Sequence, residues 1–291
     1  MKRYDNLDGL RSFAAIGIIL MHIMSNTDYQ LPHNVITNII GMAGLLVQLF
    51  FMISGFSMCC GYYERVKNGD ISLNSFYKKR YLKTLPFFAF LVCIDIVISG
   101  FNASNLIEGF SDITLMYGMF PNSDIQVIGV GWALGVIFAF YLLFPFYVFM
   151  LWTKKRGWFF FAVTVAIYYV CVYYFKGTNC NIAKWLCYFM AGGIIYLYRD
   201  NIGRIAGKYK YIMLVAVIAI SIGWYVSPGN IHGVDISALK LMIMFASWIC
   251  YSISVKSKIL SNPFTKFMSN VSFEIYLAHM MIFRVVERAG I

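Results

Sequence analysis

Long apolar runs separated by short polar connections dominate the pattern of this chain. About nine of these runs have roughly the ~20 residues that a helix needs to cross the hydrocarbon core of a bilayer. They are apolar throughout rather than at every second position, which excludes a transmembrane β-barrel. The pattern therefore predicts an all-α fold, a polytopic transmembrane bundle of about nine to ten helices. The predicted spans cover residues 10–26, 40–62, 84–101, 131–152, 157–175, 182–198, 211–227, 238–255 and 268–286.

The segment 105–120 is only partly apolar, because Glu108 and Asp112 interrupt it. We predict an external or re-entrant loop there. Counting it as a further span would move the basic cluster 154–156 to the outer side of the membrane, against the usual charge bias. With an odd number of spans and the N-terminus inside, the C-terminus is expected outside.

Composition and charge agree with a membrane protein, since 60% of the 291 residues are hydrophobic and only 13% are charged. Such a composition excludes an ordinary soluble domain. A net charge of +11 would suggest nucleic acid as a partner in a soluble protein. Here most of the 24 Lys and Arg residues fall in alternate connections, and the loop 102–130 has none, as the positive-inside rule requires. We expect a multi-pass protein of the cytoplasmic membrane, with a cytoplasmic N-terminus, in contact with lipids and not with nucleic acid.

Neither cysteines nor loop histidines suggest a metal site or a disulfide framework. The seven cysteines are odd in number, lie mostly within apolar runs and match no ligand spacing. His33 and His232 fall in short external segments and are expected to be solvated. No repeat or attached soluble domain is visible, so residues 1–291 are predicted to form a single integral-membrane domain.

Ionisable residues inside the first apolar run are the strongest sign of chemistry. Arg11 and His22 are eleven residues apart, which on an α-helix is about 20° past three turns and a rise of ~16 Å. They share one stripe of the helix, and Asp8, one turn before Arg11, lies close to it. Ionisable groups at membrane depth are usually functional. Two structural explanations stay open: Arg11 could reach the headgroups, and His22 could be one satisfied polar group inside the bundle.

A second basic pair lies at the cytoplasmic start of the third run, in the stretch 76–86. Arg80 and Lys83 are three residues apart, so they project from one face of a helix. With Tyr77 beside them they could hold a phosphate-bearing ligand at the cytoplasmic mouth, and Arg80 could do so bidentately. The alternative is that positive-inside topology alone explains them.

Polar side chains in two other runs are candidates for a pocket. Asp95 lies in the middle of the third run, where it should pair with a basic or hydroxyl partner or be protonated. Ser272, Tyr276 and His279 share one face of the last run through a 4,3 spacing.

Small and aromatic residues mark two further positions. Ser54 and Gly55 form a small patch where helices can approach closely. Trp132, at a membrane boundary, is typical of an aromatic belt, and Tyr141 follows it in the same run.

These motifs, in this order, resemble the acyltransferase-3 family of integral membrane acyltransferases, and they span almost the whole chain. The matching elements are Leu-Asp-Gly-Leu-Arg with a histidine eleven residues after the arginine (7–11 and 22), Phe-Phe-Met-Ile-Ser-Gly-Phe (50–56), Arg-x-x-Lys followed by proline (80–86), Trp-x-Leu with Phe-Tyr and proline (132–145), and Ser-Phe-Glu-Ile-Tyr-Leu-Ala-His (272–279).

The resemblance implies a bundle of about ten helices that moves an acyl group, commonly acetyl, from cytoplasmic acyl-CoA to a hydroxyl of a cell-surface or exported saccharide. Acetyl-CoA or another acyl-CoA would be the donor, with no covalently bound cofactor, and a saccharide or lipid-linked saccharide the acceptor. His22 would be the catalytic histidine, with Arg11 and Asp8 as its motif partners. Donor contacts would fall to Arg80, Lys83 and Tyr77, and the acceptor or pocket positions would be Trp132, Tyr141, Ser272, Tyr276, His279 and Asp95.

Departures from the family pattern keep a rival function open. Many members carry serine and glutamate where this chain has Ala133 and Ile137, and Lys83 replaces an arginine. The rival is a non-catalytic membrane module that binds or translocates a polar solute through the Arg11 and His22 pocket. The missing glutamate favours the rival, whereas His22 and the basic pair favour the enzyme.

Overall fold

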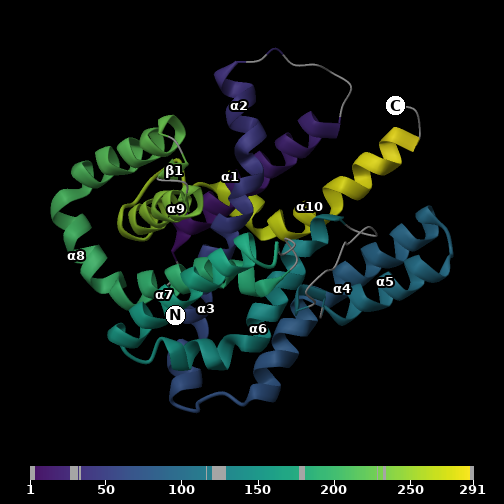
Figure 1. Cartoon of the computed structure of the whole chain (residues 1–291), viewed down its shortest axis with the longest axis horizontal. Helices are drawn as coiled ribbons and strands as arrows, with labels where there is room; N and C mark the ends of the chain where they lie inside the picture. Colours follow the sequence, from purple (N-terminus) through teal and green to yellow (C-terminus); the bar gives the residue numbers. More distant parts are fainter. Residues whose placement is uncertain are drawn as a thin grey trace.

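The computed structural model describes residues 4–26, 32, 34–115, 117–119, 129–176, 181–227, 229–231 and 234–288. These residues form ten α-helices, three 3₁₀ turns and one two-stranded hairpin, which confirms the predicted all-α bundle (Figure 1). The α-helices are α1 (Asp5–Asn26), α2 (Val35–Gly41), α3 (Leu46–Lys67), α4 (Leu73–Ser99), α5 (Ala103–Thr114), α6 (Trp132–Met150), α7 (Lys154–Tyr173), α8 (Ile182–Val226), α9 (Ser237–Ser254) and α10 (Pro263–Arg288). The 3₁₀ turns are η1 (Met42–Leu45), η2 (Tyr117–Met119) and η3 (Gly129–Gly131), and β1 (Asn230–Ile231) pairs antiparallel with β2 (Val234–Asp235).

Seven helical segments among the described residues are long and apolar enough to cross a membrane, so the chain is a multi-pass membrane protein. The last predicted span, 268–286, is helical within α10, but α10 does not belong to these seven. Its apolar character is interrupted by polar residues that face other helices, as described below. The predicted helix is therefore confirmed at 268–286, but this helix is less apolar than the seven candidate spans.

Two predicted spans, 182–198 and 211–227, lie in the two helical parts of α8, which has 45 residues and a kink between these parts. The backbone leaves helical geometry only at Tyr209 (φ −125°, ψ 31°), where α8 is kinked. Figure 1 shows α8 curving around α9, against which it packs. The predicted break between the two spans is therefore found at Tyr209, within the predicted connection 199–210, although the residues of that connection on either side of it are helical. Polar residues indicate where a chain leaves an apolar environment, but they do not by themselves end helical hydrogen bonding.

The third predicted span also begins earlier than expected, because α4 starts at Leu73. Ser72 caps the helix by accepting a hydrogen bond from the backbone N–H of Ser75 at 3.2 Å. Pro86 lies inside α4 and leaves one backbone hydrogen bond of the helix unmade. The basic stretch before it is therefore part of the same helix, and this places its side chains along the bundle.

The segment 105–120 contains the short helix α5, whose 12 residues do not qualify as a span. It folds back on α4: a Cβ on Gly109 would lie only 2.5 Å from Ile96 Cδ1, so the two helices touch directly. Asn102 caps its start and Leu115 ends it in the left-handed conformation (φ 58°). The described part of the predicted loop is thus largely a short helix, and α5 is not among the helices long and apolar enough to cross a membrane.

Glycines set the closest helix crossing, between α3 and α8. A Cβ on Gly55 would overlap the carbonyl oxygen of Phe189, and one on Gly192 would overlap that of Met52. Around the crossing the rings of Phe51 and Phe189 stack with centroids 5.2 Å apart. The small patch predicted at Ser54 and Gly55 therefore does allow close helix approach.

The cysteines described by the structure are all free. No group of three or more histidine, cysteine or acidic side chains among the described residues could hold a metal ion. His33, His232 and Cys180 lie outside the described residues.

Asp112 on α5 gives a testable pH dependence. Its side chain is fully buried, and neither carboxylate oxygen has a hydrogen-bond partner among the described residues. Burial, with smaller contributions from the carboxylates of Glu108 and Asp95, raises its pKa to about 8. Arg284 of α10 is ion-paired with Asp95 rather than with Asp112.

Because the folded pKa of Asp112 exceeds the unfolded value, the folded state holds a proton that the unfolded state loses. The contribution of Asp112 to the free energy of unfolding is thus fully present below about pH 4, and it is lost as the pH rises to about 8. We expect wild type and Asp112→Asn, which mimics the protonated acid, to melt at similar temperatures at about pH 4. The wild type should melt lower at pH 9. Thermal unfolding in detergent measures both, and parallel pH curves would contradict the assignment.

Candidate functional site

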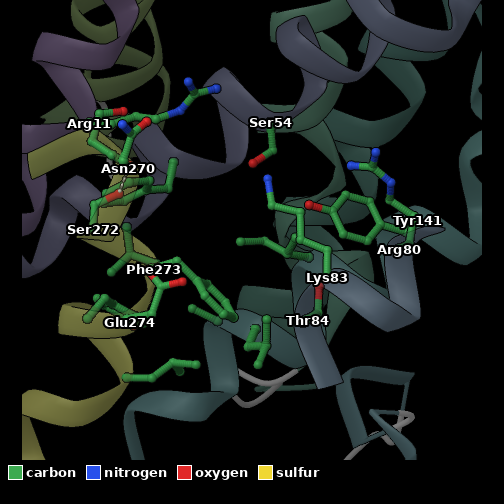
Figure 2. A pocket seen from close by; sticks show the side chains of 18 of the residues that line it. Arg11, Ser54, Arg80, Lys83, Thr84, Tyr141, Asn270, Ser272, Phe273 and Glu274 are labelled. Carbon is green, nitrogen blue, oxygen red and sulfur yellow. Dashed lines mark hydrogen bonds between the residues drawn. The ribbon is translucent and has the colours of Figure 1, made fainter. Parts of the chain in front are cut away.

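A cavity of about 410 Å³ lies between α1, α3, α4, α6 and α10, within the size range of small-molecule sites (Figure 2). It gathers residues that are far apart in the sequence. Seven of the predicted site residues line it, namely Asp8, Arg11, Arg80, Lys83, Tyr141, Ser272 and Tyr276.

Asp8 and Arg11 form the cavity wall contributed by α1. Arg11 Nη1 lies 3.1 Å from Asp8 Oδ1, as the i,i+3 spacing predicted. Arg11 also donates to Ser57 Oγ on α3 at 2.7 Å, and Asp8 accepts from Ser269 Oγ on α10 at 3.2 Å. The two charged side chains therefore join three helices, and their ion pair holds the guanidinium at a fixed place on the wall.

Gly9, which lies between Asp8 and Arg11, leaves room for a close backbone contact. A Cβ on Gly9 would overlap the backbone of Leu260, so α1 lies directly against the connection between α9 and α10. Ser12 strengthens this contact by donating to the carbonyl oxygen of Thr265 at 2.8 Å. The Leu-Asp-Gly-Leu-Arg motif is thus an anchor that positions Arg11 as well as a source of charge.

Arg80 is held between two tyrosines. Its guanidinium carbon lies 4.7 Å from the ring centroid of Tyr62 and 5.6 Å from that of Tyr141, and Nη2 donates to the Tyr62 hydroxyl at 2.5 Å. Its Nε is buried and has no hydrogen-bond partner among the described residues. A fixed, aromatic-flanked guanidinium with an unused donor is suited to a bound anion.

Lys83 extends into the same cavity from one turn further along α4. Figure 2 shows its ammonium group pointing toward the hydroxyl of Ser54 on α3. No ion pair to Lys83 is found within the described parts of the chain. Asp8 is engaged by Arg11, and Glu274 adds a carboxylate from α10. With three cations and two carboxylates, the lining has a net positive charge that favours an anionic ligand.

His22 lies outside the cavity lining, further along α1. Its ring is beside that of His279 on α10, with centroids 5.2 Å apart and planes at 45°. Phe50 and Tyr276 meet at the adjacent part of the cavity, with centroids 6.4 Å apart, and Tyr276 in turn contacts His279 at 5.9 Å. Tyr276 thus contacts both the cavity and the pair of histidines.

Three predicted site residues do not line the cavity, because their side chains make contacts in other parts of the bundle. The Tyr77 hydroxyl donates to the carbonyl oxygen of Leu142 at 2.9 Å and so joins α4 to α6. Trp132 packs against Phe51 and Trp185. Asp95, 1% exposed, pairs with Arg284 at 2.9 Å, which confirms that a carboxylate in this span has a basic partner.

The cavity also includes Ser54, which the sequence marked only for helix packing, and four polar residues that were not predicted site residues: Thr84, Ser269, Asn270 and Glu274. Glu274 lies within the motif 272–279, and its place in this motif was a signal that could have pointed to a site residue. The departures Ala133 and Ile137 both line the cavity. This wall is therefore apolar in this chain, and the lining carboxylates come from Asp8 and Glu274 instead.

Comparisons with known proteins agree with these motifs. A family model described as an acyltransferase domain matches residues 4–291. Acyltransferase MdmB of Streptomyces mycarofaciens is 28% identical over 155 residues, 49% of this chain and 38% of that protein. O-acetyltransferase OatA of Staphylococcus aureus (strain NCTC 8325 / PS 47) is 30% identical over 156 residues, 48% of this chain and 24% of that protein. The chain thus covers well under half the length of these relatives, and no solved structure matches it.

Proposed function

The chain belongs to the acyltransferase family whose domain model matches residues 4–291, and on that premise we propose that it is a membrane O-acyltransferase. The donor is an acyl-CoA, with acetyl as the acyl group, and the acceptor is a hydroxyl of a cell-surface or exported saccharide. The observation that carries this proposal is the cavity in which Arg11, Arg80 and Lys83 converge. The similarity to a protein named as an O-acetyltransferase supports the acetyl group.

The basic cavity suits the phosphate groups of CoA. Arg80 offers a guanidinium whose Nε is unused, and Lys83 offers an ammonium without an ion-pair partner among the described residues. Phosphates are bound by such charge-assisted hydrogen bonds. Tyr141 and Tyr62 hold Arg80 in place, which lowers the entropy lost on binding.

His22 is the proposed general base. It lies eleven residues beyond Arg11, a helix rise of ~16 Å, so phosphates and reacting thioester would occupy separate places joined by the linear pantetheine arm. His22 takes the proton of the acceptor hydroxyl as the oxygen attacks the thioester carbonyl carbon. The carbon–sulfur bond then breaks, and the leaving thiolate of CoA receives the proton from His22. The products are the ester and free CoA.

The proposed topology places the N-terminus in the cytoplasm and the chain in the cytoplasmic membrane. The bias of Lys and Arg toward alternate connections supports this orientation. It puts the basic mouth on the side where acyl-CoA is made. The acceptor would then meet the thioester deeper in the bundle, near His22.

Donor binding provides the first test. We expect acetyl-CoA to raise the melting temperature of the purified protein in detergent, since a ligand at 100 times its Kd stabilises by about 2.7 kcal/mol. Arg80→Ala should remove most of this shift, because it deletes the guanidinium in the cavity. Differential scanning fluorimetry with increasing acetyl-CoA measures the effect.

Lys79→Ala is the matched control, because Lys79 is the exposed neighbour of Arg80 on α4 and does not line the cavity. It should leave the acetyl-CoA shift unchanged. A wild-type protein that is indifferent to acetyl-CoA would contradict the proposal. That result would favour the polar-solute module, which the apolar Ile137 in the cavity wall otherwise supports.

A further inference from the structure

The imidazole of His279 on α10 carries a buried polar atom without a partner. Its Nδ1 lies 2.6 Å from the carbonyl oxygen of Tyr276 in the preceding turn. Its Nε2 is buried and makes no hydrogen bond to any described residue. An orphaned buried acceptor destabilises a fold, so its presence calls for a reason other than packing.

The contact at Nδ1 determines how the neutral ring is protonated. A backbone carbonyl oxygen only accepts hydrogen bonds, so Nδ1 carries the hydrogen and donates it. In the neutral imidazole, Nε2 is then the nitrogen with the lone pair. The carbonyl of Tyr276 therefore keeps Nε2 of His279 available as an acceptor.

His22 is placed to use this acceptor. The two ring centroids are 5.2 Å apart, and ring nitrogens lie on the perimeter, so one nitrogen from each ring can come within hydrogen-bond distance when the His22 ring turns. Apart from the backbone bonds within α1, the hydrogen bond of His22 to the described residues is one that its carbonyl oxygen accepts from Asn26 Nδ2 at 2.7 Å. Its ring is thus not held in another orientation by a hydrogen bond from this part of the chain.

A catalytic histidine that gains a proton is commonly oriented by a carboxylate. Within the described residues, no carboxylate forms an ion pair with His22 or with His279. The nearest motif carboxylate along α1, Asp8, is bonded to Arg11 and Ser269 instead. The position that a carboxylate would fill beside His22 is occupied by the second imidazole.

We propose that His279 is a positioning residue for His22 and accepts a hydrogen bond from the imidazolium that forms during acyl transfer. This inference rests on the proposed function. When His22 takes the acceptor proton on one nitrogen, its other N–H is donated to Nε2 of His279. His22 keeps this N–H when it returns the acceptor proton from its other nitrogen to the CoA thiolate, so His279 undergoes no net change.

Two substitutions separate this role from a structural one. In His279→Asn, the amide nitrogen overlies Nδ1 and retains the bond to the Tyr276 carbonyl, but no atom replaces Nε2. In His279→Gln, the longer side chain brings an acceptor oxygen near the place of Nε2 but gives up the bond to Tyr276. A structural role would therefore be preserved better by asparagine, and the proposed role better by glutamine.

The experiment measures thiol release from acetyl-CoA, with a cell-envelope glycan extract as acceptor, for wild type and both variants. Asparagine should lower kcat by about tenfold or more, as expected for impaired general-base catalysis. Glutamine should retain several times the kcat of asparagine. The KM for acetyl-CoA should change little in both, because His279 does not line the basic cavity. Melting temperatures of all three proteins accompany the rates.

A His279→Asn variant with the wild-type kcat would overturn the role of His279. The role would also be overturned if the rates followed the melting temperatures and His279→Asn were faster than His279→Gln. Absence of donor-dependent thiol release by the wild type would instead overturn the acyltransferase proposal, and with it this inference. Because the wild type is assayed first, the two failures are distinguishable.

Discussion

Replacing His22 by alanine is expected to lower acyl transfer by at least about 10²-fold and as much as 10⁴-fold, the range contributed by a general base. The substitution removes the group that takes the hydroxyl proton, and no carboxylate among the described residues is paired with either histidine to replace it. Thiol release from acetyl-CoA in the presence of a cell-envelope glycan extract measures the loss.

The same variant should keep its fold and its donor site. His22 does not line the basic cavity, so the rise in melting temperature caused by acetyl-CoA should match that of the wild type. This control contrasts with Arg80→Ala, which should lose donor binding. A His22→Ala protein that retains most of the transfer rate would show that another group removes the proton.

Gly192→Ala is expected to be strongly destabilising. The added methyl would overlap the carbonyl oxygen of Met52 and lie 2.8 Å from the backbone nitrogen of Phe56. Backbone atoms cannot move aside by changing rotamer, so α8 would have to shift away from α3. Overpacking of this kind costs about 1–3 kcal/mol or more, and thermal unfolding in detergent should show a drop of several degrees.

Gly203→Ala in the same helix is the matched control. Nothing lies within 4 Å of a Cβ at Gly203, and alanine favours a helix over glycine by up to about 1 kcal/mol. This variant should therefore be as stable as the wild type or slightly more stable. If both alanine variants melted alike, the close contact between α3 and α8 would not be the cause of the glycine at 192.

Local spacing in the sequence determined several parts of the site. An i,i+3 relation is fixed by helix geometry alone, and so the sequence predicted both the Asp8 and Arg11 contact and the common direction of Arg80 and Lys83. The same reasoning placed Ser272 and Tyr276 on one face of α10, where both line the cavity. The need of Asp95 for a basic partner also followed, because a buried carboxylate in a membrane span is costly when unpaired.

Apolar runs likewise determined the class of the protein, because only a closed set of backbone hydrogen bonds can cross a membrane. They did not determine where helices end. The polar stretch 199–210 is helical on either side of the kink at Tyr209, and α4 begins at Leu73, before the apolar run. Burial preference and hydrogen-bond geometry are separate properties, and hydropathy reports only the first.

The sequence by itself thus determined a helical membrane bundle and a set of charged and polar side chains on particular helix faces. Only the tertiary structure decided which faces meet. It joined Asp95 to Arg284 across 189 positions, brought Glu274 into the cavity with Arg11, and set His279 beside His22 from the opposite end of the chain. Contacts between distant helices depend on the shapes of whole packed surfaces, such as the one that Gly9 opens against Leu260. No local spacing rule contains that information, because helical periodicity relates residues only along a single helix.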